Sequence, residues 1–246
     1  MTRRIHSTAL DHTFTVNVML PRDCVKGDGQ SYPVVILNDG QNQWKGQGSY
    51  GGWHTDAIAV DMARRGRCRD IVLVAVLCPP DRDTAYLPPP QGIADRYVDF
   101  LADILLPALR EELPLTLEPG GTGIIGSSYG ANSAVYAGLR HPETFGLVGS
   151  LSYPGVPGDP VLERMRSGSS LPMLRLYADC GTRWSYDQPD VDDFSDVTRD
   201  LVGIARDKGM LPGKTLLGIV AEGHFHNEFF WRKRIGRCLE FLFPPA

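Results

Sequence analysis

The sequence predicts an α/β fold in which a mostly parallel sheet carries helices on both faces. Continuous apolar runs, at residues 32–40 and 69–80, are typical of strands that are buried on both faces. Stretches with apolar residues at helical spacing alternate with such runs along the chain. In addition, an apolar strand-like run turns abruptly into a helical pattern at residues 122–131. Together these observations favour parallel strands joined by helices.

Length and composition fit one domain over residues 1–246. The chain has 246 residues, of which 42% are hydrophobic and 22% are charged, which is enough for one well-buried core. The pattern contains no repeat, linker or low-complexity tract. We therefore expect a single α/β domain.

The charge and the apolar patterning exclude several classes of partner. A net charge of −4 and a pI near 5.9 give no electrostatic case for binding nucleic acid or an anionic membrane. The N-terminus lacks the apolar core of a signal peptide, and no 18 consecutive residues are apolar. The five cysteines are odd in number and widely spread, which predicts reduced thiols. We expect a cytoplasmic protein. The sequence does not determine its oligomeric state, and a homo-oligomer is one of the alternatives.

The first half of the chain alternates predicted strands with predicted helices. Residues 3–20 favour two antiparallel strands. Thr55 or Asp56 can cap the first helix, and Gly66 can close it. Pro107 is expected to bend its helix, because proline removes one backbone donor. The expected elements are strands at 32–40 and 69–80 and helices at 56–65 and 93–108, with a proline-rich loop at 81–92.

The second half begins with the strand that ends at Ser127 and a helix that should stop at His141, before Pro142. The other expected elements are strands at 145–152, 171–181 and 214–223, helices at 196–208 and 227–243, and a loop at 153–170 with a short helical turn. In parallel sheets, ligand sites lie at the carboxyl ends of the strands. We therefore expect the loops after Asn38, Ser127, Ala178 and Glu222 to converge.

Residues 126–130 read Gly-Ser-Ser-Tyr-Gly, the Gly-x-Ser-x-Gly pattern of a nucleophile elbow. The turn from strand to helix is so sharp that the residues two before and two after the serine must be nearly without side chains. Gly126 and Gly130 meet this need around Ser128, whereas Ser127 has no such pair. A glycine-rich turn without function is disfavoured by the strand before it and the helix after it. The pattern therefore predicts an α/β-hydrolase fold with Ser128 as the nucleophile.

A serine hydroxyl is a poor nucleophile at neutral pH and needs a base within hydrogen-bond reach. Histidine is the usual base. In α/β hydrolases the chain order is serine, acid, histidine, and His224 and His226 directly follow the last predicted strand. A second requirement is a pair of backbone donors for the oxyanion. One of them should be the N–H of Tyr129, directly after the nucleophile.

At these residues the chain resembles the esterase D-like family of α/β hydrolases, which also contains enterochelin esterases, feruloyl esterases and the antigen 85 mycolyltransferases. The resemblance covers nearly the whole chain, and its most specific parts are the segment 39–42, Asp-Gly-Gln-Asn, and the spacing of His226 to Trp231. In the family, the catalytic histidine stands five residues before a tryptophan, which implies His226 as the base. The family pattern also implies the N–H of Gln41 as the second oxyanion donor, against the alternative of a solvent-facing loop amide.

The triad acid is where the sequence departs from the family. Relatives carry Glu or Asp directly after the Cys-Gly-Thr-basic turn, and Trp184 stands there instead. The first carboxylate beyond that position is Asp187, which we predict as the acid, with Asp190 next. The remaining candidates are Asp179 at a strand end and, near the cap of the following helix, Asp192 and Asp193.

Trp44, Trp53 and Trp184 all fall on loops at the predicted site end of the sheet. Each of them alone is more simply explained by packing, but together they favour a large apolar or sugar-bearing acyl substrate. The sequence has no metal-ligand spacing, phosphate-binding loop or dinucleotide fingerprint, so neither a metal nor a cofactor is predicted.

The predicted function is therefore serine carboxylic-ester hydrolysis of a small-molecule ester through an acyl-enzyme. Two alternatives remain open at this stage. An acyltransferase would use the same residues to pass the acyl group to an alcohol. A non-catalytic binding protein on a hydrolase scaffold would explain the tryptophan at the position of the acid.

Overall fold

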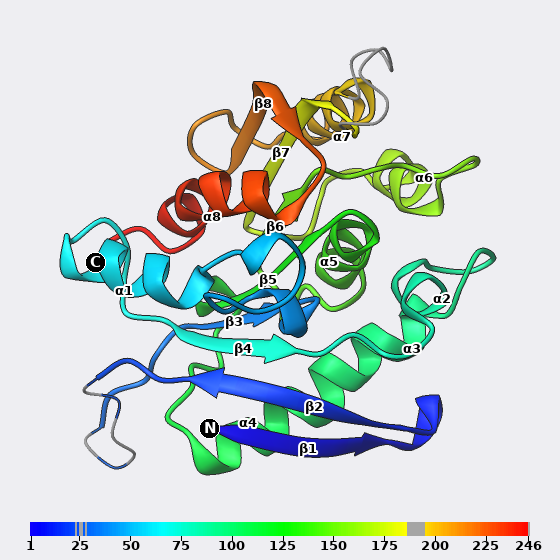
Figure 1. Ribbon diagram of the computed structural model, residues 1–246. Helices are drawn as coiled ribbons and strands as arrows, with labels where there is room; N and C mark the ends of the chain where they lie inside the picture. The colour runs from blue at the N-terminus through cyan, green and yellow to red at the C-terminus, as the bar shows by residue number, and fades with distance from the viewer. Residues whose placement is uncertain (23, 25–26, 28, 186–194, 246) are drawn as a thin grey trace.

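The structure is a computed structural model that describes every residue except 23, 25–26, 28, 186–194 and 246. Its described residues form an eight-stranded sheet in the order β1-β2-β4-β3-β5-β6-β7-β8 (Figure 1). The strands β1 and β2 are antiparallel to their neighbours, and all other pairs are parallel. The bounds are β1 Thr2–Ser7, β2 His12–Met19, β3 Val34–Leu37, β4 Val72–Val76, β5 Thr122–Ser127, β6 Leu147–Leu151, β7 Arg175–Arg183 and β8 Leu216–Phe225. The predicted α/β-hydrolase-type fold is confirmed.

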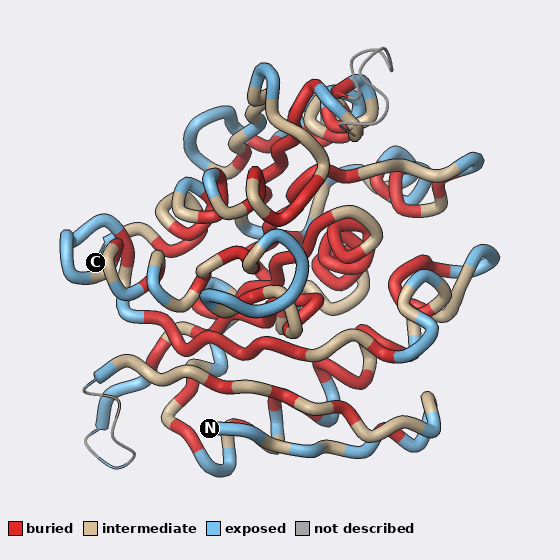
Figure 2. The backbone as a smooth tube through the Cα atoms, in the orientation of Figure 1, coloured by how far each residue is buried: buried red, intermediate tan, exposed pale blue. Residues whose placement is uncertain are grey.

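Helices cover both faces of the sheet because the central strands are apolar on both sides. Along β3, Val34 and Ile36 belong to one core and Val35 and Leu37 to the other, as the two-residue period of a strand requires. In Figure 2 these strands are buried throughout. One face carries α1 (Thr55–Arg64) and α8 (Glu228–Leu242), and the other carries α3 (Ala94–Asp99), α4 (Leu106–Glu112), α5 (Tyr129–Arg140), α6 (Pro160–Ser167) and α7 (Asp196–Asp207).

Two predictions about the first half were wrong. The stretch 81–92, predicted as a loop, contains α2 (Arg82–Tyr86), whose first turn is capped because the Asp81 side chain accepts from the Thr84 N–H. Helix α1 is not capped by Thr55 or Asp56: His54 stands at its N-cap with a φ of 58° and makes no side-chain cap bond. The Thr55 hydroxyl instead donates to the Gln43 side chain at 2.8 Å.

The long helix around Pro107 also differs from the expectation. Between α3 and α4 the chain forms a π-helical segment, Phe100–Leu105, and Pro107 lies in the first turn of α4. The residues before Pro107 are already helical, and the helix continues past the proline to Glu112 and does not stop at Ala108. The remaining predicted strands and helices are present within about two to four residues of their expected bounds. None of the described helices is both long and apolar enough to cross a bilayer.

Candidate active site

Ser128 lies on the turn between β5 and α5, at the carboxyl edge of the parallel strands. Its φ of 54° and ψ of −133° put a non-glycine residue in a sparsely populated region, which costs on the order of 1–3 kcal/mol. The glycines make the turn possible, because a Cβ on Gly126 would overlap the Gly130 carbonyl. The structure therefore has the strained backbone that the Gly-x-Ser-x-Gly pattern predicts.

Buried polar contacts hold this turn in place. The Ser128 N–H donates to the Leu151 carbonyl at 3.1 Å. Asn38, at the end of β3, donates to the Gly130 carbonyl at 2.9 Å and accepts from the Tyr97 hydroxyl at 2.9 Å. Both side chains are buried. The sequence offered no signal for this role of Asn38 and Tyr97, because the contacts join β3, α3 and α5.

The two predicted oxyanion donors, the N–H groups of Tyr129 and Gln41, have no hydrogen-bond acceptor among the described residues. Gln41 is half-buried, and its side chain is fixed against Cys78: its Oε1 accepts from the Cys78 N–H at 3.1 Å, and its Nε2 lies 3.2 Å from the Cys78 Sγ. This geometry is not that of a solvent-facing loop amide. Both N–H groups are thus available to an incoming acceptor.

An ion pair joins the loop after β3 to the serine turn. Arg82, on α2, donates to both carboxylate oxygens of Asp39 at 2.7 Å each, and its Nη2 lies 3.4 Å from the Ser127 carbonyl. Asp39 itself is in the left-handed region, with a φ of 54°. Sequence reasoning missed Arg82 because α2 was predicted as a loop. Its bidentate contact fixes the Gln41 loop relative to Ser128.

His226 follows β8 and lies between two tryptophans. Its ring centroid is 4.1 Å from that of Trp184 and 5.1 Å from that of Trp231, and the backbone N–H of His226 donates to the backbone carbonyl of Trp184 at 3.3 Å. The pairing of Arg183 with Phe225 at the ends of β7 and β8 brings Trp184 and His226 together. The Ser128 hydroxyl makes no hydrogen bond to a described residue in this structure; such contacts often close only when substrate binds.

Burial, together with the positive charges of Arg234 and Arg82, lowers the pKa of His226 to about 3. The imidazole is therefore neutral near pH 7, which is the state that a base requires. His224 has different neighbours: its ring is 4.8 Å from that of Phe230, and its Nδ1 accepts from Arg234 at 3.2 Å. Of the two histidines, His226 is the one that contacts Trp231 and Trp184.

The carboxylate predicted to orient the base lies outside the described residues. This holds for Asp187 and Asp190, and also for Asp192 and Asp193. Asp179 is described and fully buried. Its two carboxylate oxygens accept from Arg234 Nε at 2.9 Å and from the Tyr177 hydroxyl at 2.7 Å, so both are already engaged away from His226.

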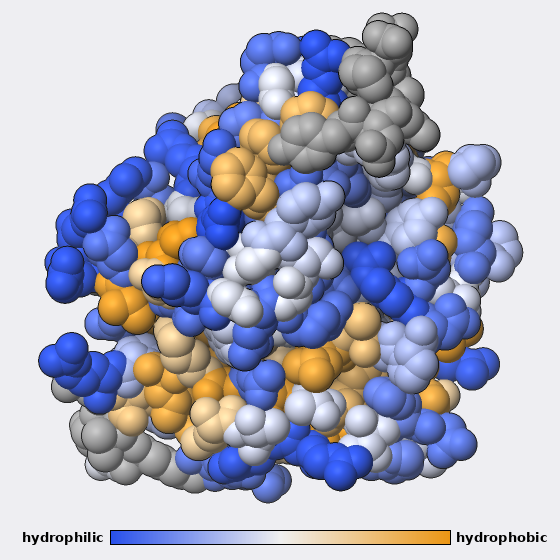
Figure 3. All heavy atoms as spheres, viewed as in Figure 1, coloured by the Kyte–Doolittle hydropathy of each residue, from blue (hydrophilic) through white to orange (hydrophobic). Residues whose placement is uncertain are grey.

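The three predicted substrate-binding tryptophans lie in different surroundings. Trp53 is 1% exposed and packs 5.5 Å from Trp231, which makes its ring part of the core. Trp44 is half-buried and lines an open hollow of about 450 Å³ with Asn17 and Met19. Figure 3 shows hydrophobic residues gathered over the β2 and β4 part of the sheet. Trp184 is the one of the three that contacts His226.

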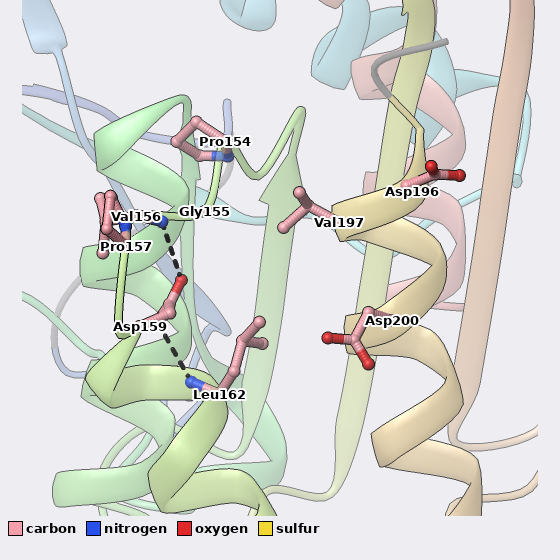
Figure 4. A pocket seen from close by; sticks show the side chains of 9 residues that line it. All are labelled: Pro154, Gly155, Val156, Pro157, Asp159, Leu162, Asp196, Val197 and Asp200. Atoms are coloured by element: carbon pink, nitrogen blue, oxygen red, sulfur yellow. Dashed lines mark hydrogen bonds between the residues drawn. The ribbon is translucent and has the colours of Figure 1, made fainter.

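A second hollow, of about 470 Å³, opens beyond the carboxyl end of β6 (Figure 4). Its walls are mostly apolar, Asp196 and Asp200 of α7 are among its lining residues, and the Asp200 carboxylate points into it. Asp159, another lining residue, accepts from the N–H groups of Val161 and Leu162 at 3.0 and 3.2 Å. None of the predicted catalytic or oxyanion residues is among its described lining residues.

One group of possible metal ligands, Asp99, Asp103 and His141, was found among the described residues. It lies at the far end of α5 from Ser128, a helix of 12 residues and therefore about 18 Å long. Arg140 donates to both oxygens of Asp99 at 2.6 and 2.8 Å. A cation there would compete with this guanidinium, so the group has no role at the candidate site.

Fold and site together define the class, an α/β-hydrolase-type protein with a serine on the strained turn after its central strand. The family described as "Putative esterase" matches residues 7–200, and the chain belongs to this family. Membership makes the protein an ester hydrolase and supports carboxylic ester hydrolysis as its reaction.

The chain is similar to one curated protein and to solved structures of esterases. The chain is 23% identical over 232 residues to "Uncharacterized protein YbbA" of Bacillus subtilis, a match over 88% of this chain and 87% of that protein. A ferulic acid esterase structure has a TM-score of 0.77 at 17% identity and covers 100% of this chain and 98% of its own. The enterobactin esterase from Shigella flexneri has a TM-score of 0.76 at 20% identity, over 98% of this chain and 58% of its own. At these identities the structural likeness shows the fold.

Proposed function

We propose that this protein is a serine carboxylic-ester hydrolase that works through an acyl-enzyme. The observation that carries the proposal is Ser128 on its strained turn, with the N–H of Tyr129 next to it and that of Gln41 on the adjoining loop, neither of them bonded within the described residues. A serine with two available backbone donors is suited to acyl transfer, because the donors stabilise the charge that develops on the carbonyl oxygen.

In the proposed reaction the Ser128 Oγ attacks the ester carbonyl carbon while its proton passes to the His226 imidazole. The oxyanion of the tetrahedral intermediate accepts from the N–H groups of Tyr129 and Gln41, each donor contributing a factor of about 10²–10³ in rate. The intermediate collapses, the alcohol leaves with the proton from His226, and Ser128 remains acylated. Water, deprotonated by His226, then releases the acid and restores the serine.

The imidazolium formed in the first step needs a carboxylate partner. The charged residues that most affect His226 among the described part of the chain are Arg234 and Arg82, both positive, and they oppose its protonation. Asp179 is occupied by Arg234 and Tyr177. These surroundings support a carboxylate from the segment after Trp184 as the triad acid, with Asp187 the first choice and Asp190 the second.

We propose a small-molecule ester with an aromatic or sugar-bearing part as the substrate. Trp184 offers an aromatic surface directly beside the base, and aromatic rings pack well on such a surface. The neighbours named as ferulic acid esterase and enterobactin esterase support an ester of this kind. Neither a metal nor an organic cofactor is part of the proposed reaction.

Covalent labelling tests the proposal. A fluorophosphonate should label the wild-type protein at Ser128, as mapped by mass spectrometry, and chromogenic acyl esters should give a burst of leaving group. Ser128→Ala should abolish both signals. The matched control is Ser127→Ala, the neighbouring serine, which should keep them. Labelling at Ser127, or none on the folded wild-type protein, would contradict the proposal. Product analysis with added alcohol distinguishes a hydrolase from an acyltransferase.

A further inference from the structure

A buried polar network lies behind the candidate site. It consists of Asp179, Arg234, Ser152 and Trp231, which are 0%, 5%, 1% and 6% exposed. The Arg234 Nε donates to Asp179 at 2.9 Å, and its Nη2 donates to the Ser152 hydroxyl oxygen at 2.9 Å. Trp231 Nε1 donates to the same oxygen at 3.0 Å. Ser152 Oγ is thus the acceptor that joins the guanidinium to the indole.

The two ends of this network touch the two halves of the site. Ser152 directly follows Leu151, whose carbonyl accepts the N–H of Ser128 at 3.1 Å. Trp231 contacts the ring of His226, with centroids 5.1 Å apart. A path of direct contacts therefore runs from the backbone of the nucleophile to the ring of the base.

The backbone of Ser152 is itself held in an unusual conformation. Its φ of 51° lies in the left-handed region, where serine is uncommon. Its N–H donates to the backbone carbonyl of Asp179 at 2.5 Å. Asp179 therefore holds Ser152 in two ways. Its backbone carbonyl accepts from the Ser152 N–H, and its side chain binds Arg234, which in turn donates to the Ser152 hydroxyl oxygen. Both contacts fix the chain directly after β6.

Stability alone does not explain why these charges are buried. The desolvation of an ion pair can exceed its Coulombic gain, and apolar residues of similar volume often stabilise as well. What a guanidinium provides is a planar fork with donors in fixed directions. Arg234 uses this fork on Asp179 of β7, on Ser152 after β6 and on His224 of β8.

We propose that Arg234, held by Asp179, is a positioning residue that sets the location of His226 relative to Ser128 through Ser152 and Trp231. The proposal rests on the proposed function, in which Ser128 is the nucleophile and His226 the base. Trp231 and Arg234 attach the first turns of α8 to the end of β6 through the Ser152 Oγ. Without these bonds the two segments are no longer held together at this point. A shift of about 1 Å in a reacting group can cost about 100-fold in rate.

The test is Ser152→Ala, which removes the shared acceptor without introducing a charge. The control is Ser150→Ala, which removes a hydroxyl that is also buried, on the same strand, and has no partner among the described residues. With a chromogenic ester, well below the melting temperature of each variant, kcat of Ser152→Ala should fall about 10- to 100-fold while KM changes less than about twofold. Ser150→Ala should keep its kcat within about twofold.

A kcat of Ser152→Ala within about twofold of the wild type would overturn the proposal. The double variant Arg234→Met with Asp179→Leu gives a second test, because it removes both charges together and leaves none unpaired. It should fold and show the same loss in kcat; a folded double variant with wild-type kcat would also overturn the proposal. Fluorophosphonate labelling of the wild type at Ser128 separates this outcome from a failure of the proposed function, which would abolish labelling itself.

Discussion

The strained turn at Ser128 depends on glycines next to it in the sequence, whereas the ring of His226 is held by residues from two other parts of the chain. The sharp turn at Ser128 requires Gly126 and Gly130, and their effect is steric, since a Cβ on Gly126 would overlap the Gly130 carbonyl. The ring of His226 instead contacts Trp184 beyond β7 and Trp231 of α8.

The electrostatic surroundings differ as well. The nucleophile has two backbone donors near it, the N–H of Tyr129 on the serine turn and that of Gln41 on the loop after β3, and such donors attract a negative charge. The base side is buried and carries the positive charge of Arg234, and both effects lower the pKa of His226. A local steric pattern can therefore be recognised in a sequence, while the lowered pKa of His226 depends on contacts that only the folded chain creates.

Removing the base is the most direct way to separate the two histidines of this region. His226→Ala should lower kcat by about 10⁴- to 10⁶-fold, as expected for the loss of a base in a serine hydrolase. His224→Ala removes an acceptor of Arg234 and should lower kcat less than about 10-fold. Steady-state kinetics with a chromogenic ester measures both. Equal losses, or a greater loss for His224→Ala, would contradict the assignment of the base.

Much of the fold could be predicted because its signals are local. The apolar runs of β3 and β4 show two buried faces, and the strand, turn and helix at Ser128 carry their own steric pattern. Helix α2 was not predicted, since its five residues, Arg82–Tyr86, are too few to display a helical period. For the same reason Arg82 could not be connected with Asp39.

The site could be predicted less completely. Asn38 and Ser152 support the nucleophile and the base through contacts between distant segments, and nothing beside them in the sequence marks these roles. Trp53 looks like a loop residue in the sequence but is 1% exposed, because it packs against Trp231. The acid, predicted at Asp187, lies outside the described residues and stays a prediction.

The serine side can be tested with its two glycines. Gly126→Ala would bring a Cβ into the Gly130 carbonyl, so the turn must open and Ser128 must move; we expect kcat/KM to fall about 100-fold or more. Gly130→Ala is the matched control, because its Cβ would lie 3.2 Å from the Asp39 carboxylate and 3.4 Å from the Asn38 Cβ, a tight but smaller conflict. Its loss should stay below about 10-fold. Similar losses in the two variants would show that the elbow is less rigid than its sequence pattern implies.

The smallest effect concerns how stability depends on pH on the base side. His226 has a pKa of about 3 in the folded protein, against an ordinary value of about 6.5. Between these two values the unfolded chain binds a proton that the folded chain does not, so stability should fall as the pH falls below about 6.5. At pH 5.5 the loss attributable to His226 is about 1 kcal/mol, or about 2–4 °C in melting temperature for a chain of this size.

His226→Phe should remove this contribution, because phenylalanine retains a ring between Trp184 and Trp231 but does not titrate. The measurement is the change in melting temperature between pH 7.5 and pH 5.5, which should be smaller in His226→Phe than in the wild type. His6→Asn, which removes an exposed histidine, is the control and should keep the wild-type change. An unaltered change in His226→Phe would mean that a carboxylate already offsets the burial of the imidazole. In that case the pKa of His226 would be determined by an acid such as Asp187 more than by Arg234 and by burial between the two tryptophans.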